Sequence, residues 1–191
     1  MTTTTTAPSI VKPSLIGECV VYLGVLNYFF TVDEWTPVVS RIGREIGRLQ
    51  LRITPCVAVV HRASSMRHVE DEFVPYKCVD VDIPEEQIHE QMDQTLQYRV
   101  ELRQLSQLAP QRFSHLSLRY TFFRETSTQT PPFRVDPSGD SMSLGLEFRH
   151  VVDVNDALVK YVTSSNLTIE ILGHMSERMV SKFEKSVKAS S

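Results

Sequence analysis

Residues 47–54 read GRLQLRIT, and this stretch decides the fold class. Leu49, Leu51 and Ile53 alternate with arginine and glutamine, the period of two of a strand that has one face in the core and the other in water. The same alternation recurs over residues 98–103, 116–122, 144–150 and 167–171. Strands of this kind, separated by turns, predict a mainly β protein, an antiparallel β-sandwich with two or three short helices.

Shorter signals set the expected ends of the other elements. The apolar run Glu18 to Leu26 predicts a buried strand, and Pro55 is expected to end the strand that contains Leu51. Residues 85–94, which follow Pro84, are expected to be helical. A second helix, ending near residue 164, is expected to have Asp153 as its N-cap.

The expected organisation is one sandwich between two tails. Residues 1–14 are rich in threonine and are expected to be disordered, and residues 174–191 form an amphipathic tail. Between them, strands over 17–54 precede an insertion over 57–95 and further strands over 96–173. The two sets of strands form either one sandwich, completed by the N-terminal strands, or two incomplete units with open edges.

The composition excludes several classes of protein. The chain has 191 residues, 41% hydrophobic and 23% charged, with a net charge of −3, which gives no general electrostatic case for nucleic acid. The longest apolar run, Cys19 to Phe30, is too short for a transmembrane helix, and we expect no signal peptide, because no charged segment followed by an apolar one is seen near residue 1. Three cysteines make no disulfide framework, so we expect a cytoplasmic protein.

No motif indicates catalysis. The phosphate-binding patterns G-x-x-x-x-G-K-[ST] and G-x-G-x-x-G are absent, so we expect no nucleotide cofactor. Cys56 and His61 are the nearest candidates for a thiol nucleophile and its base, but nothing predicts the required hydrogen bond. His150 is expected to be a hydrogen-bonded histidine of the interior or the rim. No closely spaced ligand set indicates zinc, and we expect neither enzymatic activity nor a metal.

Three arginines are candidate interaction residues. Arg99, Arg103 and Arg119 fall on the outward parity of strands that are expected to be adjacent. If those strands pair, a basic strip results that could contact anionic lipid headgroups or an acidic protein surface such as tubulin. The alternative is an ordinary charged sheet face, because Glu101 lies among the arginines and scattered surface charges contribute little.

The C-terminal tail supplies the other candidate interaction residues. Its large apolar side chains recur every four positions: Met175, Met179, Phe183 and Val187. Basic residues lie around this stripe, which predicts a short amphipathic helix. A lone helix of this length is marginal in water. The stripe should therefore be covered, either by the sandwich itself or by a partner chain in a helix-in-groove contact or a coiled coil.

Several blocks of the chain follow one another in a familiar order. The first, residues 15–56, is LIGECVVYLGVLNYFFTVDEWTPVVSRIGREIGRLQLRITPC, and FVPYKCVDVDIP follows from Phe73. The later blocks are YRVELRQLSQLAPQRFSHLSLRYTFF from Tyr98 and LEFRHVVDVNDALVKYVTSSNLTIEILG from Leu146. In order and spacing these blocks resemble the non-motor stalk and tail region of kinesin-3 family motors, which includes a C2-like domain.

This resemblance implies a C2-like antiparallel β-sandwich with a permuted strand order and no motor domain. Calcium is not expected, because residues 106–115, where the first calcium-binding loop would lie, contain no acidic residue. The implied function is a non-catalytic protein-interaction module in cargo, cytoskeletal, microtubule or flagellar attachment, with a kinesin, a cargo adaptor or a cytoskeletal protein as partner. The alternative is a calcium-independent peripheral module that binds anionic lipid.

Overall fold

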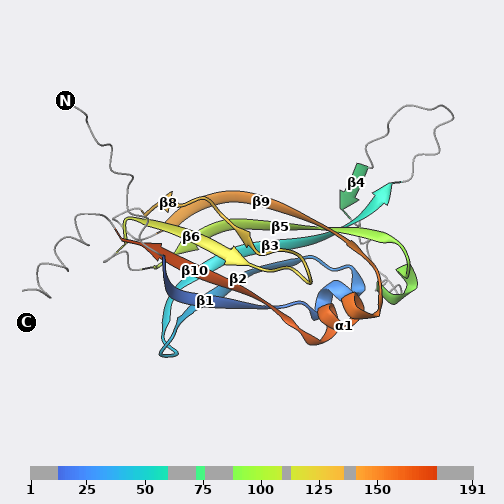
Figure 1. Ribbon diagram of the computed structural model, residues 1–191, viewed down its shortest axis with the longest axis horizontal. Coiled ribbons are helices and arrows are strands. Elements are labelled where there is room, and N and C mark those ends of the chain that lie inside the picture. The colour runs from blue at the N-terminus through green and yellow to red at the C-terminus, as the bar shows by residue number, and fades with distance from the viewer. Residues whose placement is uncertain (1–12, 60–71, 76–87, 109–112, 136–140, 176–191) are drawn as a thin grey trace, which may run out of the picture.

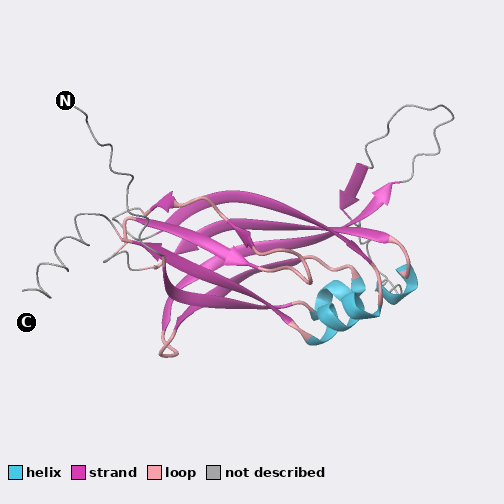
Figure 2. Ribbon diagram, in the orientation of Figure 1, coloured by secondary structure: helices cyan, strands magenta, loops and turns pink. Residues whose placement is uncertain are grey.

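The computed structural model describes residues 13–59, 72–75, 88–108, 113–135 and 141–175 (Figure 1). Most of them are in strands, so the mainly β prediction is confirmed (Figure 2). The strands are β1 (Ser14–Tyr22), β2 (Val32–Ser40), β3 (Glu45–Val59), β4 (Glu72–Pro75), β5 (Thr95–Ser106), β6 (His115–Tyr120), β7 (Thr128–Gln129), β8 (Phe133–Arg134), β9 (Ser141–Asp153) and β10 (Asn166–His174). The helical elements are the 3-10 turns η1 (Gly24–Tyr28) and η2 (Ile88–Gln91) and the helix α1 (Asp156–Ser164).

All of these strands belong to one antiparallel sheet. Its order is β7-β6-β10-β1-β2-β3-β5-β9, with β4 paired to β3 and β8 paired to β6. β1 pairs with β10 from Ser14 to Tyr22, and β3 pairs with β5 from Arg48 to Val57. The N-terminal strands therefore lie between the C-terminal ones and complete a single sheet, as the first of the two alternatives predicted. The alternative of two incomplete units is wrong.

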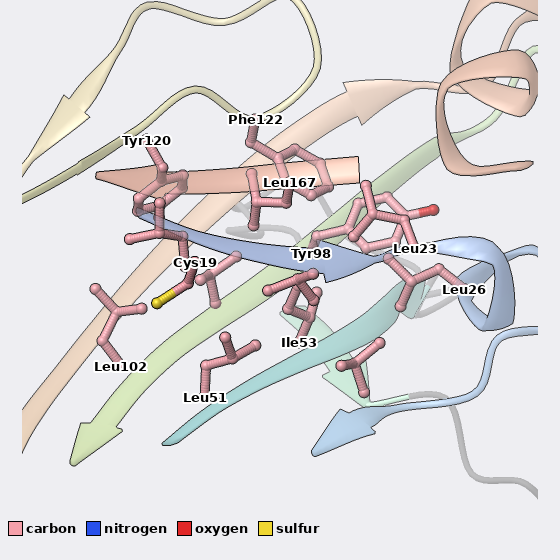
Figure 3. Close-up of a cluster of buried hydrophobic side chains, with 14 of the residues drawn as sticks. Cys19, Leu23, Leu26, Leu51, Ile53, Tyr98, Leu102, Tyr120, Phe122 and Leu167 are labelled. Carbon is pink, nitrogen blue, oxygen red and sulfur yellow. The ribbon is translucent and has the colours of Figure 1, made fainter. Parts of the chain in front are cut away.

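The sheet curls around one hydrophobic core. Figure 3 shows side chains from distant strands meeting there, among them Cys19 of β1, Leu51 of β3 and Tyr120 of β6. Leu49, Leu51 and Ile53 are fully buried, which confirms the parity read from their alternation. Each such side chain contributes about 1.5–3 kcal/mol through its removal from water. At one end of the sheet α1 and η1 pack together, and their buried leucines extend the same core (Figure 2).

Among the described residues, contacts between side chains connect β6 and the segment after it to β9. The ring of Tyr120 lies edge-on to Phe148 with centroids 6.0 Å apart, and its hydroxyl is 2.8 Å from Nε2 of His150. His150 stacks on Phe122 at 4.9 Å, and its Nδ1 is 2.5 Å from a carboxylate oxygen of Glu125. With 3% of its surface exposed and both ring nitrogens bonded, His150 is the interior histidine predicted from the sequence. We call this contact line the seam.

The expected helix over 85–94 is wrong where the structure describes it. Only the 3-10 turn η2 is present, and it is followed by Asp93 in the left-handed region with φ of 64°. The N–H of Asp93 then donates to the carbonyl of Val154, and the N–H of Val154 donates to the carbonyl of Gln94. These bonds tie the chain to the end of β9, so it enters β5 instead of extending a helix.

The cap of α1 is also not the one expected. Asn155 is the N-cap, and its Oδ1 accepts hydrogen bonds from the N–H groups of Ala157 and Leu158, both at 3.1 Å. Asp153 instead ends β9, and its carboxylate accepts a hydrogen bond from the hydroxyl of Thr95 across the ladder. An asparagine one residue before the helix satisfies two backbone donors that Asp153 is too far away to reach.

Two strand predictions need correction. The run from Glu18 to Leu26 is half-exposed strand as far as Tyr22, and η1 follows it. Pro55 does not end β3, which continues to residue 59. On one side of β3, the ladder with β2 ends at Ile53 and the ladder with β4 begins at Cys56. Pro55 lies in the gap between these two ladders, where its missing N–H group is tolerated.

Some predictions fall outside the described residues. These are most of the disorder predicted for residues 1–14, the surface loop containing His61, and the tail from residue 176 onward with Met179, Phe183 and Val187. At the end of the first range Ser14 is ordered, because it begins β1. Met175 is described and is 38% exposed.

Candidate interaction surfaces

The arginines of β5 are held in ion pairs with neighbouring carboxylates. Arg103 lies 3.0 Å from Glu101 and 3.4 Å from Asp33 of β2, which is itself 2.6 Å from Arg52. Arg99 lies 3.6 Å from Glu147 of β9. Each pair is partly exposed and contributes little to stability, but it offsets the positive charge of the arginine.

Arg119 is not part of a strip with the other two. It lies on β6, and β6 pairs with β10, β7 and β8, whereas β5 pairs with β3 and β9. The condition for a continuous basic strip, pairing of β5 with β6, is therefore not met. Arg119 forms its own ion pair with Glu170 across the β6–β10 ladder at 2.5 Å. A surface hollow of about 340 Å³ lies beside this pair, so the guanidinium that an anion would need there is already engaged.

The two described cysteines have environments that suppress thiolate formation. Burial, with a smaller effect of the neighbouring Glu18 carboxylate, raises the pKa of Cys19 to about 12. Burial also raises the pKa of Cys56, whose Sγ lies 3.7 Å from the carbonyl oxygen of Thr54. The nearby charges of Arg99 and Arg149 act in the lowering direction on the pKa of Cys56, but burial has the larger effect. Because the thiolate is the nucleophile, neither side chain has the low pKa of a reactive cysteine.

The described part of the chain contains neither a metal-binding cluster nor a membrane-spanning helix. Within those residues, no three histidine, cysteine, aspartate or glutamate side chains are grouped so that they could hold a metal ion. No helix among them combines the length and the apolar character needed to cross a bilayer.

An exposed apolar surface lies on the outer face of β1 and β2. Val20 and Tyr22 project from β1, and Trp35 and Pro37 project from β2; we call these four residues the β1–β2 patch. Val20 is 51% exposed, Tyr22 62% and Trp35 42%, although the residues between them on each strand face the core. Large apolar side chains grouped on an ordered outer face mark a site of interaction with another molecule.

The surroundings of the patch are polar and include both charged and uncharged residues. Glu18 precedes Val20 on the same face of β1, and Pro37 pairs with Arg48 of β3. On the β10 side, Val20 pairs with Thr168 and Tyr22 pairs with Asn166. On the β3 side, Trp35 pairs with Gln50. An apolar centre with a polar rim is the usual composition of a protein–protein interface.

Two local features shape the patch. The ladder between β1 and β2 consists of Gly17–Ser40 and Glu18–Val39, so the strands carry no ladder pair beneath the patch itself. The Tyr22 ring folds back over Gly24, where an added Cβ would lie 2.4–2.5 Å from the ring and its hydroxyl. Glycine at this position therefore allows the ring to rest on the backbone, which fixes its orientation before any partner binds.

Sequence reasoning missed the patch because residues 19–26 read as a continuous apolar run, which is typical of a strand buried on both faces. The available signal was the alternation of Glu18, Val20 and Tyr22 with Cys19 and Val21, which places a charged residue on the same face as the two exposed apolar ones.

No family model matches the chain, and a search of curated proteins finds no match.

Proposed function

We propose that this chain is a non-catalytic protein-interaction module that binds its partner through the β1–β2 patch. The observation that carries the proposal is the exposure of Tyr22 and Trp35 on an otherwise well-packed sheet. Tryptophan and tyrosine dominate the binding energy of protein interfaces when a partner covers them, because they bury a large area with few rotatable bonds. The polar rim around them supplies the hydrogen-bonding border that such interfaces have.

The biological setting of the proposal comes from the sequence resemblance alone. Like the kinesin-3 stalk and tail region, the module acts in attachment to cargo or to the cytoskeleton, including microtubules and flagella, in the cytoplasm. Its partner is a kinesin, a cargo adaptor or a cytoskeletal protein.

The charges of the outer face favour a protein partner over anionic lipid. Lipid binding needs several free basic side chains close to one surface. Arg99, Arg103 and Arg119 each have a carboxylate partner, and Arg119 is separated from the other two by the strands between β6 and β5. Lipid binding is therefore kept as an outcome of the test.

The test is affinity capture from cell extract with the full chain as bait. The Trp35→Ala, Tyr22→Ala double variant removes the aromatic centre of the patch. Ile42→Ser is the matched control, because Ile42 is 87% exposed in the β2–β3 turn, away from the patch. The proposal predicts a motor, adaptor or cytoskeletal protein that is captured by the wild type and by Ile42→Ser and lost by the double variant.

Two results contradict the proposal. One is equal capture of that protein by all three chains, which places the binding site elsewhere. The other is salt-sensitive co-sedimentation of the chain with anionic liposomes that is lost when Arg99, Arg103 and Arg119 become glutamate, which assigns the lipid function instead.

A further inference from the structure

A second apolar surface lies at one end of the seam. Beyond the contacts of Tyr120 with Phe148 and His150, the two arms of the sheet separate and leave a groove of about 250 Å³. One wall is formed by Pro131, Pro132 and Phe133 at β8, and the other by Met142, Leu144 and Leu146 of β9. The three β9 side chains are half-buried and pack against the core, so their remaining surface faces the groove.

The groove runs beside a sheet edge. β9 pairs with β5 from Ser141 to Asp153, and no other described strand pairs with β9. A long edge with apolar side chains along it is a template for unwanted pairing, and proteins commonly cover such an edge with a helix or a loop.

We propose that residues 176–191 of this same chain cover the groove as a short helix, with Met179, Phe183 and Val187 resting on the three apolar side chains of β9. This proposal is independent of the β1–β2 patch, which lies on the outer face of other strands.

The path of the chain supports this occupant. β10 ends at the same side of the molecule as β8 and the beginning of β9, at the left of Figure 1. His174 pairs with His115, and His115 pairs with Arg134, so the end of β10 lies two strand spacings, about 10 Å, from the groove wall. Residues 176–178 can span about 10 Å when extended, which brings Met179 to the groove.

The spacing of the apolar residues also matches. Along a helix, residues four apart rise about 6 Å, so Met179 to Val187 covers about 12 Å. β9 has a register shift here, so Met142 and Leu146 pair with Leu105 and Leu102, which are three residues apart on β5, and the stretch covers about 10 Å. Three apolar side chains of the tail can thus face three of β9, while the basic side chains around the stripe extend to solvent.

The experiment is a cysteine pair placed in the full chain. Leu144→Cys is combined with Phe183→Cys, and Cys78→Ser removes a competing thiol; Cys19 and Cys56 are fully buried and stay. The proposal predicts an intramolecular disulfide under mild oxidation of the monomer. The matched control pairs Phe183→Cys with Val151→Cys, which is 52% exposed on the same strand and roughly 24 Å from Leu144, and it should not cross-link.

Other cross-linking results overturn the proposal. A disulfide between two molecules would show that a second copy occupies the groove. Equal yields from the two cysteine pairs, or none from either, would show that the tail does not rest there.

Hydrogen exchange gives a measurement that needs no new cysteine. In the Phe183→Glu variant, amides of residues 141–146 should exchange several-fold faster than in the wild type, because the tail no longer shields them. Amides of residues 49–53 should exchange as before, which shows that the sheet is still folded. Unchanged exchange over 141–146 would contradict the proposal.

Discussion

The outer face of the sheet carries two kinds of exposed side chain: the arginines of β5 and β6, and the aromatic residues of the β1–β2 patch. They differ in whether the protein itself supplies a partner for them. Each arginine finds a carboxylate within 3.6 Å, either on its own strand or on a neighbouring one. No such pairing can compensate the exposed apolar surface of Tyr22 and Trp35. This surface is removed from water only when another molecule covers it or when the chain refolds.

Exposed aromatic residues indicate an interaction site more strongly than exposed arginines do. Arginine is the residue type that a search for interaction sites selects first, yet paired surface charges contribute about 0–1 kcal/mol and leave little net potential. Exposed tryptophan and tyrosine side chains, such as Trp35 and Tyr22, contribute large binding energies when a partner covers them. On the outer face, the charges of the arginines are thus paired with carboxylates, whereas the apolar side chains of the β1–β2 patch remain exposed to water.

The largest expected effect is on stability, and it distinguishes a core residue, Leu51, from a nearby residue of the patch, Trp35. Leu51→Ala removes a fully buried side chain and should lower the free energy of unfolding by about 2–5 kcal/mol. Trp35→Ala, across the ladder from Gln50, should cost several-fold less, because Trp35 is 42% exposed. Urea denaturation of both variants measures the difference. Equal losses would show that Trp35 is part of the core and that the patch is not a free surface.

Charge reversal tests the neutralised region. Arg103→Glu places a carboxylate beside Glu101 and Asp33 and should destabilise the fold by about 1 kcal/mol through lost pairing and repulsion. Arg41→Glu is the control, since no ion pair joins Arg41 to another described residue, and it should change the denaturation midpoint little. If neither charge reversal changes the denaturation midpoint, the ion pairs do not form in solution, and the arginines are available to bind a partner.

A smaller effect tests the orientation of Tyr22. Gly24→Ala puts a methyl group where the Tyr22 ring now rests, so the ring must move while the sheet stays folded. Partner binding should weaken a few-fold, by about 1 kcal/mol. In a Tyr22→Ala background the same substitution should have no further effect on binding, since the ring it displaces is gone. Additive losses in the double variant would mean that Gly24 acts through another contact.

The sequence predicts the parts of this structure that depend on neighbours in the chain. Alternation of apolar and polar residues identified β3, β5, β6, β9 and β10 and the inward parity of Leu49, Leu51 and Ile53, because side-chain direction in a strand repeats every two residues. His150 was placed correctly in the interior for the same reason.

Strand order is not predictable in this way. β5 and β6 are consecutive in the chain, yet β5 pairs with β9 and β3, and this choice decides that Arg119 lies apart from Arg99. The pairing depends on which strands together close the core, a property of the whole chain. The exposure of Val20 and Tyr22 is only weakly marked in the sequence. A run of apolar residues has the same composition whether one face or both faces are buried, and Glu18 is the one charged residue that shares their face.

The central claim is that a protein partner covers the β1–β2 patch, and Trp35 reports on this directly because it is the single tryptophan of the chain. The chain is labelled with fluorotryptophan, and its one fluorine NMR resonance is recorded with the captured partner and, separately, with anionic liposomes. Binding of the partner should shift or broaden the resonance, and liposomes should leave it unchanged. A partner that binds without changing the resonance of Trp35 would contradict the account.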